Sequence, residues 1–410
     1  MQDHRLSRRD GPPHVRPQSA CRSTSPRRWS SQLRRAIDAS LFHWYHVFHR
    51  LVEEDFLVKE QEVKELAVSA LKKCLGRVPE ARVENARYDV PVSQDLTIDM
   101  VVRVRLRGEH RTLVAEVKAN GQPRRAREAI WQLRKILEQT RYADASALFI
   151  APSVSETTAR MCLEAGIGYL DLAGNCLINV PGLFIERSGA DAGYKEKRAT
   201  VSIFSPKSSR VLRVLLSDVQ RTWQVQRLAA TAHVSLGLAS KVKQALADRE
   251  WIAATATGVR LSRPEELLDA WAESYTYRKN AAVDFYSLDG PAETESAIAA
   301  YCAERGIDYA LTGFSGARLT APRVRYARAT VYVANGVDAL AASVGFKRVE
   351  TGANVLLLKP YDEGIYFGAV QRFGLRVVSP IQLYLDLRSM AGRADEAADE
   401  LLQREIRPGW

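Results

Sequence analysis

The amino-acid sequence predicts an α/β protein of several domains, with three folded segments behind a basic tail. Its 410 residues suit two to four domains, and 46% hydrophobic residues are enough to build their cores. Residues 37–190 and 280–410 mix strand and helix patterns, whereas residues 203–275 are mainly helical and end in a small hairpin. Two polar stretches, at 188–202 and 274–284, separate these segments.

The tail over residues 1–36 contains nine Arg and two Asp, which is +7 of the formal net charge of +11. It is rich in Arg, Ser and Pro and poor in apolar residues, a composition typical of disorder. It lacks the apolar segment of a secretory signal. It is either a phosphate-binding arm or an unstructured extension, and we favour the extension. The remaining chain carries about +4, which permits a nucleic-acid partner without requiring one.

Cysteine content and hydropathy argue against three classes of protein: disulfide-bonded, zinc-binding and membrane-spanning proteins. The five cysteines are odd in number, scattered and without a CxxC pair, which argues against a disulfide framework and against structural zinc. No stretch approaches the roughly 20 apolar residues of a membrane-spanning helix. We therefore expect a cytoplasmic protein without a membrane partner. The cysteines are Cys21, Cys74, Cys162, Cys176 and Cys302.

A β-hairpin is predicted within residues 96–118, where apolar and polar residues alternate on both sides of a glycine. A two-residue type II′ turn at Gly108-Glu109 makes facing residue numbers sum to 217. On this register Asp99 lies opposite Lys118, and Glu116 lies diagonal to Asp99. The three charged side chains then share one face, and the apolar side chains face a core.

This cluster has the composition of a metal-dependent phosphodiester site. Two neighbouring carboxylates, Asp99 and Glu116, favour a cation between them, and oxygen ligands suit Mg²⁺. Such a metal activates water, and a nearby lysine stabilises developing charge. Arg103 and Arg105, further along the same face, would attract a phosphate backbone. The alternative is a hairpin face with solvated charges.

Asp99 followed by "AEVK" at 115–118 resembles the PD-(D/E)XK nuclease superfamily, which has the restriction-endonuclease-like fold. A helix after Pro123 and a strand in "ASALFIAP" fit the same order, and the resemblance covers residues 55–187. It implies that Asp99 and Glu116 bind Mg²⁺ and that Lys118 and Gln132 complete the catalytic set. The proline that usually precedes the motif aspartate is absent. A nuclease fold retained only for DNA binding is the alternative.

Residues 203–275 read as three helices followed by a hairpin, and they resemble a winged helix-turn-helix. The third helix of such a domain enters the DNA major groove. A protein-binding winged helix is the alternative. The predicted DNA-contacting residues are Ser235, Ser240, Lys241, Lys243 and Gln244 on or before that helix, and Arg260 on the wing.

The last segment carries a Gly/Ser-rich stretch, "TGFSGA" at 312–317, which predicts a tight turn in preference to a phosphate cradle. A nucleotidyl transferase would also need paired acids on a nearby strand, and "ATVYVAN" has none. This stretch and residues 377–402 resemble the C-terminal domain of AbiEi-type antitoxins of type IV toxin–antitoxin systems. Those proteins place a nucleotidyltransferase-like domain after a DNA-binding winged helix, and the resemblance covers about residues 205–410.

Three hypotheses follow. The first is a double-stranded DNA-binding protein of the AbiEi type, acting as a transcriptional autoregulator or a phage-defence component, with a cognate toxin as protein partner. The second is a Mg²⁺-dependent DNA endonuclease that its winged helix targets. The third is an antitoxin that binds only protein. The expected domains are 37–190 (nuclease-like), 203–275 (winged helix) and 280–410 (nucleotidyltransferase-like).

Overall fold

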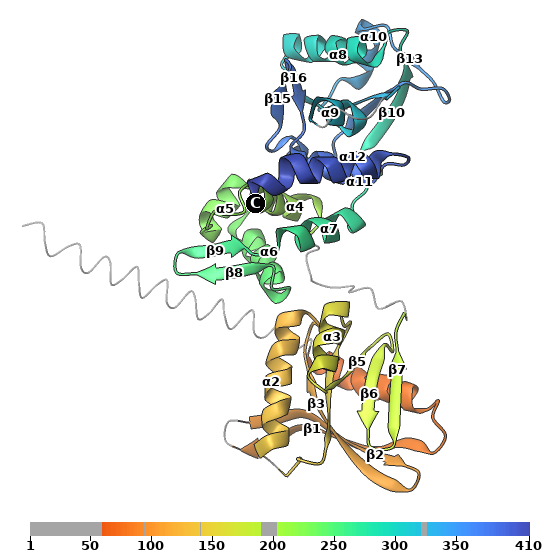
Figure 1. The fold of residues 1–410 in the computed structure, drawn as a ribbon, viewed down its shortest axis with the longest axis vertical. Helices are drawn as coiled ribbons and strands as arrows, with labels where there is room; N and C mark the ends of the chain where they lie inside the picture. Colours follow the sequence, from red (N-terminus) through yellow and green to blue (C-terminus); the bar gives the residue numbers. More distant parts are fainter. Residues whose placement is uncertain (1–59, 94–95, 140, 190–202, 321–325) are drawn as a thin grey trace, which may run out of the picture. The chain divides into compact units, whose positions relative to one another are not determined.

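A computed structural model describes residues 60–410, except for residues 94–95, 140, 190–202 and 321–325 (Figure 1). The predicted basic tail lies outside the described residues. Within them the chain forms two seven-stranded sheets and one two-stranded sheet, together with helices. The α/β class predicted from the sequence is confirmed. No helix of the described part of the chain is long and apolar enough to cross a membrane.

The first α/β segment, residues 60–189, is a sheet with helices on both faces (Figure 1). The strands follow chain order, and the neighbours from β3 to β5 are parallel while the others are antiparallel. One helix, over residues 60–75, packs on one face, and α2 (Pro123–Gln139) and α3 (Glu156–Glu164) pack on the other. The strands are β1 (Ala81–Ser93), β2 (Leu96–Leu106), β3 (Glu109–Val117), β4 (Ser146–Ala151), β5 (Gly168–Asp171), β6 (Cys176–Val180) and β7 (Leu183–Arg187).

The β2–β3 hairpin has a different register from the predicted one. Leu106 faces Glu109 and Met100 faces Ala115, so facing numbers sum to 215 and the prediction of 217 is wrong. The turn residues are Arg107 and Gly108, with φ of 47° and 87°, as in a type I′ turn rather than type II′. Each residue therefore meets a partner two positions away from the predicted one. Because side chains alternate with a period of two, the predicted faces are preserved.

The helical segment, residues 203–275, has the predicted order of three helices and a hairpin. Trp223, before α5, exchanges two backbone hydrogen bonds with Val259 of the hairpin (2.7 and 2.9 Å). Gly258 permits this approach, since a Cβ there would lie 2.3 Å from the carbonyl oxygen of Trp223. The elements are α4 (Pro206–Ser217), α5 (Val225–Thr231), α6 (Leu236–Asp248), β8 (Ile252–Thr255), β9 (Gly258–Leu261) and α7 (Pro264–Ser274).

The C-terminal α/β segment, residues 280–410, contains the second seven-stranded sheet, in the order β13-β10-β14-β12-β11-β16-β15. Helices α9, α11 and α12 contact one another, while α8 contacts β11, β12 and β16. The strands are β10 (Ala281–Tyr286), β11 (Tyr309–Leu311), β12 (Ala329–Val333), β13 (Lys347–Arg348), β14 (Val355–Lys359), β15 (Val370–Arg372) and β16 (Leu375–Val377). The helices are α8 (Pro291–Arg305), α9 (Gly313–Thr320), α10 (Val337–Ser343), α11 (Pro380–Arg388) and α12 (Ala394–Leu401). Shorter helical turns are Tyr277–Lys279, Glu363–Tyr366, Leu402–Ile406 and Arg407–Gly409.

The "TGFSGA" stretch is a buried helix start, so the predicted tight turn is wrong. Helix α9 begins at Gly313, and Ser315 accepts a hydrogen bond from the backbone of Thr330 at 2.9 Å. A Cβ at Gly313 would lie 2.8 Å from Met390, and one at Gly316 would lie 2.9 Å from Leu383. These glycines let α9 pack closely against its neighbours, which leaves them no surface for a phosphate.

One hydrophobic core joins the helical segment to the C-terminal segment. Its buried residues come from α4 to α7 as well as from the second sheet and its helices. At the junction, Arg210 of α4 forms two hydrogen bonds with Asp362, both at 2.8 Å. Arg213 of the same helix donates to Gln382 of α11 and lies 4.8 Å from the ring centroid of Trp271. The first α/β segment has separate apolar clusters of its own.

A buried hydrogen-bond network around Asp386 of α11 reinforces the same junction. Asp386 Oδ1 accepts from the hydroxyls of Tyr275 (2.6 Å) and Tyr332 (3.0 Å). It also accepts from Gln382 Nε2 (2.9 Å), and Asp386 Oδ2 accepts from Thr312 Oγ1 (2.5 Å). Burial raises the pKa of Asp386 to about 6, although these hydrogen bonds oppose the shift.

Candidate functional site

The acid–lysine cluster brings together Asp99, Glu116 and Lys118, as predicted, and adds Lys64 and Asp89. Lys118 Nζ lies 3.0 Å from Glu116 Oε2 and 3.5 Å from Asp99 Oδ2. Asp99 Oδ2 also accepts from the backbone N–H of Val117 at 2.9 Å. The Glu116 side chain is fully buried. The cluster that was predicted from side-chain alternation along the two strands is therefore formed by direct side-chain contacts in the structure.

Lys64, on the helix over residues 60–75, is the part of the cluster that sequence reasoning missed. Its Nζ lies 3.0 Å from Asp99 Oδ1 and 2.5 Å from Asp89 Oδ1. Only 9% of its side chain is exposed. Asp89 sits on β1 with a φ of 49°, a conformation that non-glycine residues seldom adopt. Neither residue had a sequence signal, because tertiary packing alone brings them to Asp99.

Burial and mutual charge set the protonation of the cluster. Burial and the nearby carboxylate of Asp99 raise the pKa of Glu116 to about 8, against the effect of Lys118. Burial acts to raise the pKa of Asp99, but Lys118, the N–H of Val117 and the side chain of Glu116 together lower it. Burial acts to lower the pKa of Lys64, but its contacts with Asp89 and Asp99 raise it. At neutral pH, a protonated Glu116 therefore lies beside an ionised Asp99 and a charged Lys64.

The residues as arranged do not fit a resident divalent cation. Mg²⁺ requires oxygen ligands at about 2.0–2.1 Å in octahedral geometry. Asp99 gives one oxygen to Lys64 and the other to Val117 and Lys118. Among the described residues, no group of three or more His, Cys, Asp or Glu side chains could hold a metal ion. Mg²⁺ at Asp99 and Glu116 stays a prediction, and it requires Lys64 to withdraw.

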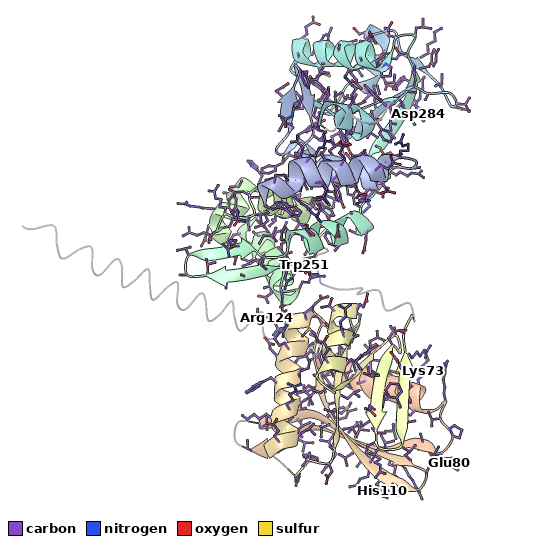
Figure 2. All side chains as sticks on the ribbon, viewed as in Figure 1. Lys73, Glu80, His110, Arg124, Trp251 and Asp284 are labelled. Atoms are coloured by element: carbon purple, nitrogen blue, oxygen red, sulfur yellow. The ribbon has the colours of Figure 1, made fainter. Side chains whose placement is uncertain are left out.

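The other residues predicted on this face lie around the cluster. Gln132 on α2 donates to the carbonyl of Thr97 at 3.4 Å, two residues before Asp99. Arg103 and Arg105 are exposed on β2, towards the hairpin turn. Arg103 is four residues from Asp99, which is roughly 13 Å along a strand, too far for an ion pair. Figure 2 shows His110, the residue that faces Arg105, near the end of this hairpin.

The residues predicted to contact DNA gather on α6 and the hairpin of the helical segment. Lys241 and Arg260 are exposed, and Ser240 and Lys243 are half-buried. Within the described chain none of the three cations forms an ion pair or side-chain hydrogen bond, so their charges are available to an anionic partner. Gln244 differs, because its Nε2 donates to Asp248 Oδ1 at 2.8 Å.

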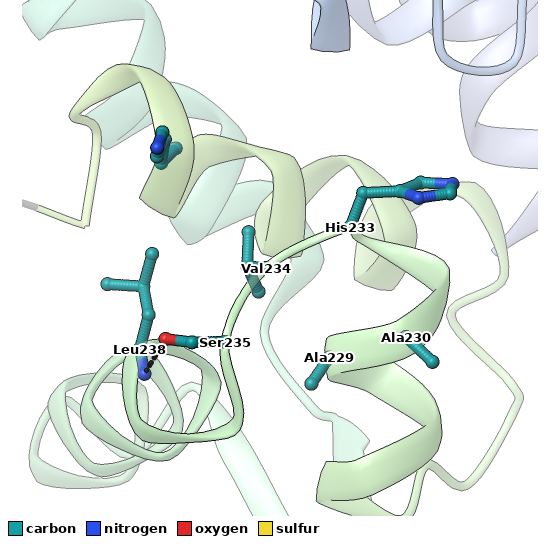
Figure 3. Close-up of a pocket in the computed structure, with 7 residues that line it drawn as sticks. Ala229, Ala230, His233, Val234, Ser235 and Leu238 are labelled. Atoms are coloured by element: carbon teal, nitrogen blue, oxygen red, sulfur yellow. Dashed lines mark hydrogen bonds between the residues drawn. The ribbon is translucent and has the colours of Figure 1, made fainter.

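Ser235 is the N-cap of α6, and its hydroxyl accepts the N–H of Leu238 at 3.2 Å (Figure 3). Beside it lies a surface hollow of about 460 Å³ between the start of α4 and the turn before α6. Lys207 and His233 are the titratable side chains of its lining. The N-terminus of α6 thus presents backbone N–H groups, and the basic side chains of Lys207 and His233 lie beside it.

Comparison with known families finds a match for the C-terminal part of the chain. Residues 260–407 match the family model described as transcriptional regulator, AbiEi antitoxin, of type IV toxin–antitoxin systems. The AbiEi resemblance of the C-terminal half is thus confirmed over these residues. In searches of the curated proteins and of the solved structures, nothing matches the chain.

The AbiEi match covers only part of the features described above. It includes Arg260 on the hairpin, helix α7 and the network around Asp386. Helices α4 to α6 and the acid–lysine cluster precede it. The roles of those preceding residues therefore rest on their own geometry.

Proposed function

We propose that this protein is a double-stranded DNA-binding transcriptional regulator of the AbiEi antitoxin type, with residues 203–275 as its winged helix-turn-helix. One observation carries the proposal. Lys241 on α6 and Arg260 on the hairpin are exposed cations that form no ion pair with the described residues. They lie on a three-helix and hairpin unit that shares its core with the AbiEi-matching segment. The description of the matched family supports the regulatory role. The two exposed cations support a DNA-binding surface on the helical segment.

In this proposal α6 enters the major groove and the hairpin contacts the flanking backbone. Lys241, Lys243 and Arg260 neutralise phosphates, and Ser235 and Ser240 lie at the leading part of the helix. Gln244 would have to leave Asp248 before both ends of its amide could read an adenine edge. We therefore assign affinity mainly to the three cations and expect Gln244 to contribute less.

The test measures binding of the full chain to duplex DNA from upstream of its own gene, by fluorescence anisotropy over a range of salt. Replacing Lys241, Lys243 and Arg260 with Ala should flatten the log K against log salt slope by roughly 0.9 per lost phosphate contact. Lys347→Ala, an exposed cation on β13, is the matched control and should change little. Absence of duplex binding, or an equal effect of the control, would refute the proposal.

A cognate toxin is the protein partner that the family description implies, and autoregulation is the corresponding role. A reporter fused to the upstream region should be repressed by the wild-type chain and released by the triple variant. If the chain neutralises a co-expressed toxin but never binds DNA, the antitoxin acts only through protein contacts, which is the third hypothesis.

We propose a nuclease-like fold for the first α/β segment, used for binding rather than cleavage. The order of hairpin, Glu-x-Lys strand and Gln132 helix supports the fold. The ion pair between Lys64 and Asp99 argues against turnover, because it occupies an oxygen that a catalytic metal would need. Plasmid incubated with the protein and Mg²⁺ or Mn²⁺ should be shifted and stay uncut. Nicking that Glu116→Ala and Lys118→Ala abolish would establish the endonuclease instead.

A further inference from the structure

Two buried cysteines of the first α/β segment, Cys74 and Cys176, support an inference that does not depend on DNA binding. We propose that they form a reversible disulfide when a hydroperoxide oxidises them. Cys74 is the attacking thiol of this pair, and Cys176 is the thiol that closes the bond. The sequence argues only against a permanent disulfide framework, and a bond that forms on oxidation is a different feature.

The two thiols meet where the helix over residues 60–75 packs against β6. Cys74 lies in the last turn of that helix, Cys176 begins β6, and both belong to the same apolar cluster. Their side chains are hydrogen-bonded to each other, and Cys74 Sγ also lies 3.9 Å from the carbonyl oxygen of Gly174. One sulfur is therefore within reach of the other for thiol–disulfide chemistry.

Arg187 provides a second, independent observation at the same place. Its Nη1 is buried and has no hydrogen-bond partner among the described residues. A Cβ on Gly174 would lie only 3.4 Å from this nitrogen, so Arg187 and Cys74 both border Gly174. A buried N–H donor without an acceptor is costly, and it is a donor that a thiolate or the oxygen of an oxidised sulfur can use.

Cys74 differs from the other buried cysteines in its ionisation. The hydrogen bond with Cys176 lowers the pKa of Cys74 to about 7, with help from the charge of Arg187 and against the effect of burial. Burial alone raises the pKa of Cys162 to about 12 and that of Cys302 to about 11. The hydrogen bond with Cys74, together with burial, raises the pKa of Cys176. Because the thiolate is the nucleophile, Cys74 is the reactive member of the pair.

Hydrogen peroxide is the hydroperoxide that balances the reaction most simply. The Cys74 thiolate attacks one peroxide oxygen, the O–O bond breaks, and the leaving hydroxide takes the proton that the thiol released and departs as water. Cys176 then attacks the sulfur of the Cys74 sulfenic acid, so that the S–S bond forms, the S–O bond breaks and a second water leaves. The two sulfurs lose two electrons in all, which reduce the peroxide. A small oxidant suits the site, because Cys74 is only 5% exposed.

The bond fastens the helix over residues 60–75 to the sheet. The same helix carries Lys64, whose Nζ lies 3.0 Å from Asp99 Oδ1, so oxidation also restrains one side of the acid–lysine cluster. The cross-link closes the loop from residue 74 to residue 176 and restricts the unfolded chain. The melting temperature of the oxidised segment should therefore rise by roughly 5–10 °C.

The experiment treats the reduced full chain with hydrogen peroxide, blocks the remaining thiols with N-ethylmaleimide and maps the unreduced peptides by mass spectrometry. Wild type should yield two peptides joined through Cys74 and Cys176, which dithiothreitol separates. Cys162→Ser is the matched control, because it removes another buried cysteine of the same segment and should leave the joined peptides in place. Arg187→Met should slow their formation several-fold at pH 7, because less Cys74 is then ionised.

Two single variants separate the attacking thiol from its partner. In Cys176→Ser the reaction should stop at a Cys74 sulfenic acid, which dimedone traps, whereas Cys176 in Cys74→Ser should not react with dimedone. Wild-type protein that gives no joined peptides, under peroxide that fully oxidises free cysteine, would overturn the inference, and so would trapping at Cys176 in Cys74→Ser. If the Ser variants do not fold, Ala at the same positions suits the apolar surroundings, and the wild-type peptide map still tests the pairing.

Discussion

Replacing Glu116 with Gln should make the first α/β segment more stable at neutral and alkaline pH. Gln has the shape of the protonated acid but cannot ionise. Burial and Asp99 raise the pKa of Glu116 to about 8, against about 4.5 in the unfolded chain. A raised pKa means that the contribution of Glu116 to stability is fully present below pH 4.5. It is lost as the pH rises through 8.

The magnitude follows from that window. Each pKa unit corresponds to about 1.36 kcal/mol, so the 2.5 units between 4.5 and pH 7 amount to about 3 kcal/mol. At pH 8.5 the cost of ionising Glu116 approaches about 4–5 kcal/mol by the same reasoning. Glu116→Gln should therefore match wild type below pH 4.5 and exceed it increasingly at higher pH.

The free energies of unfolding of wild type and Glu116→Gln are compared by urea unfolding at pH 4.5, 7 and 8.5. Hydrogen–deuterium exchange of β2 and β3 peptides then locates the stability difference in the first α/β segment. Asp99→Asn is the comparison variant, because it removes the charge that helps to raise the pKa of Glu116 and should weaken the pH dependence. The reasoning fails if Glu116→Gln and wild type show the same free energy of unfolding at pH 8.5.

Three further predictions concern other parts of the chain. Arg107→Asn should stabilise the hairpin by roughly 0.5–1 kcal/mol, because Asn tolerates the positive φ of a type I′ turn, and a loss on urea unfolding would contradict the assignment. Asp386→Ala should cost about 3–5 kcal/mol, since it leaves four buried donors without their acceptor, and a cost below about 1 kcal/mol would show that water replaces the carboxylate. Lys241→Ala alone should reduce the salt slope of duplex binding by about 0.9, and an unchanged slope would remove Lys241 from the interface.

Sequence periodicity predicted the hairpin faces correctly but not the hairpin register. Both Arg107-Gly108 and Gly108-Glu109 are plausible two-residue turns. The choice between them depends on whether Arg107 accepts the positive φ that a type I′ turn requires. The cluster of Asp99, Glu116 and Lys118 survived the error because the shift was an even number of residues.

Tertiary packing decided what the sequence could not show. Lys64 belongs to a helix that buries Val63, Ala67 and Leu71, and nothing in that pattern indicates that a neighbouring lysine reaches Asp99. Likewise, the glycines of "TGFSGA" favour a turn by local propensity, yet Gly313 and Gly316 serve helix packing. Local patterns predicted the elements here, and long-range contacts determined what those elements do.

The common core of the helical and C-terminal segments has a consequence for turnover in the cell. Loss of the C-terminal segment would expose the apolar surface that these segments share and would remove Asp386, the hydrogen-bond acceptor of Tyr275. In our proposal DNA occupancy would then end when a protease opens the C-terminal segment, because the groove-reading helices would lose their support. The helical and C-terminal segments should therefore unfold as one cooperative unit.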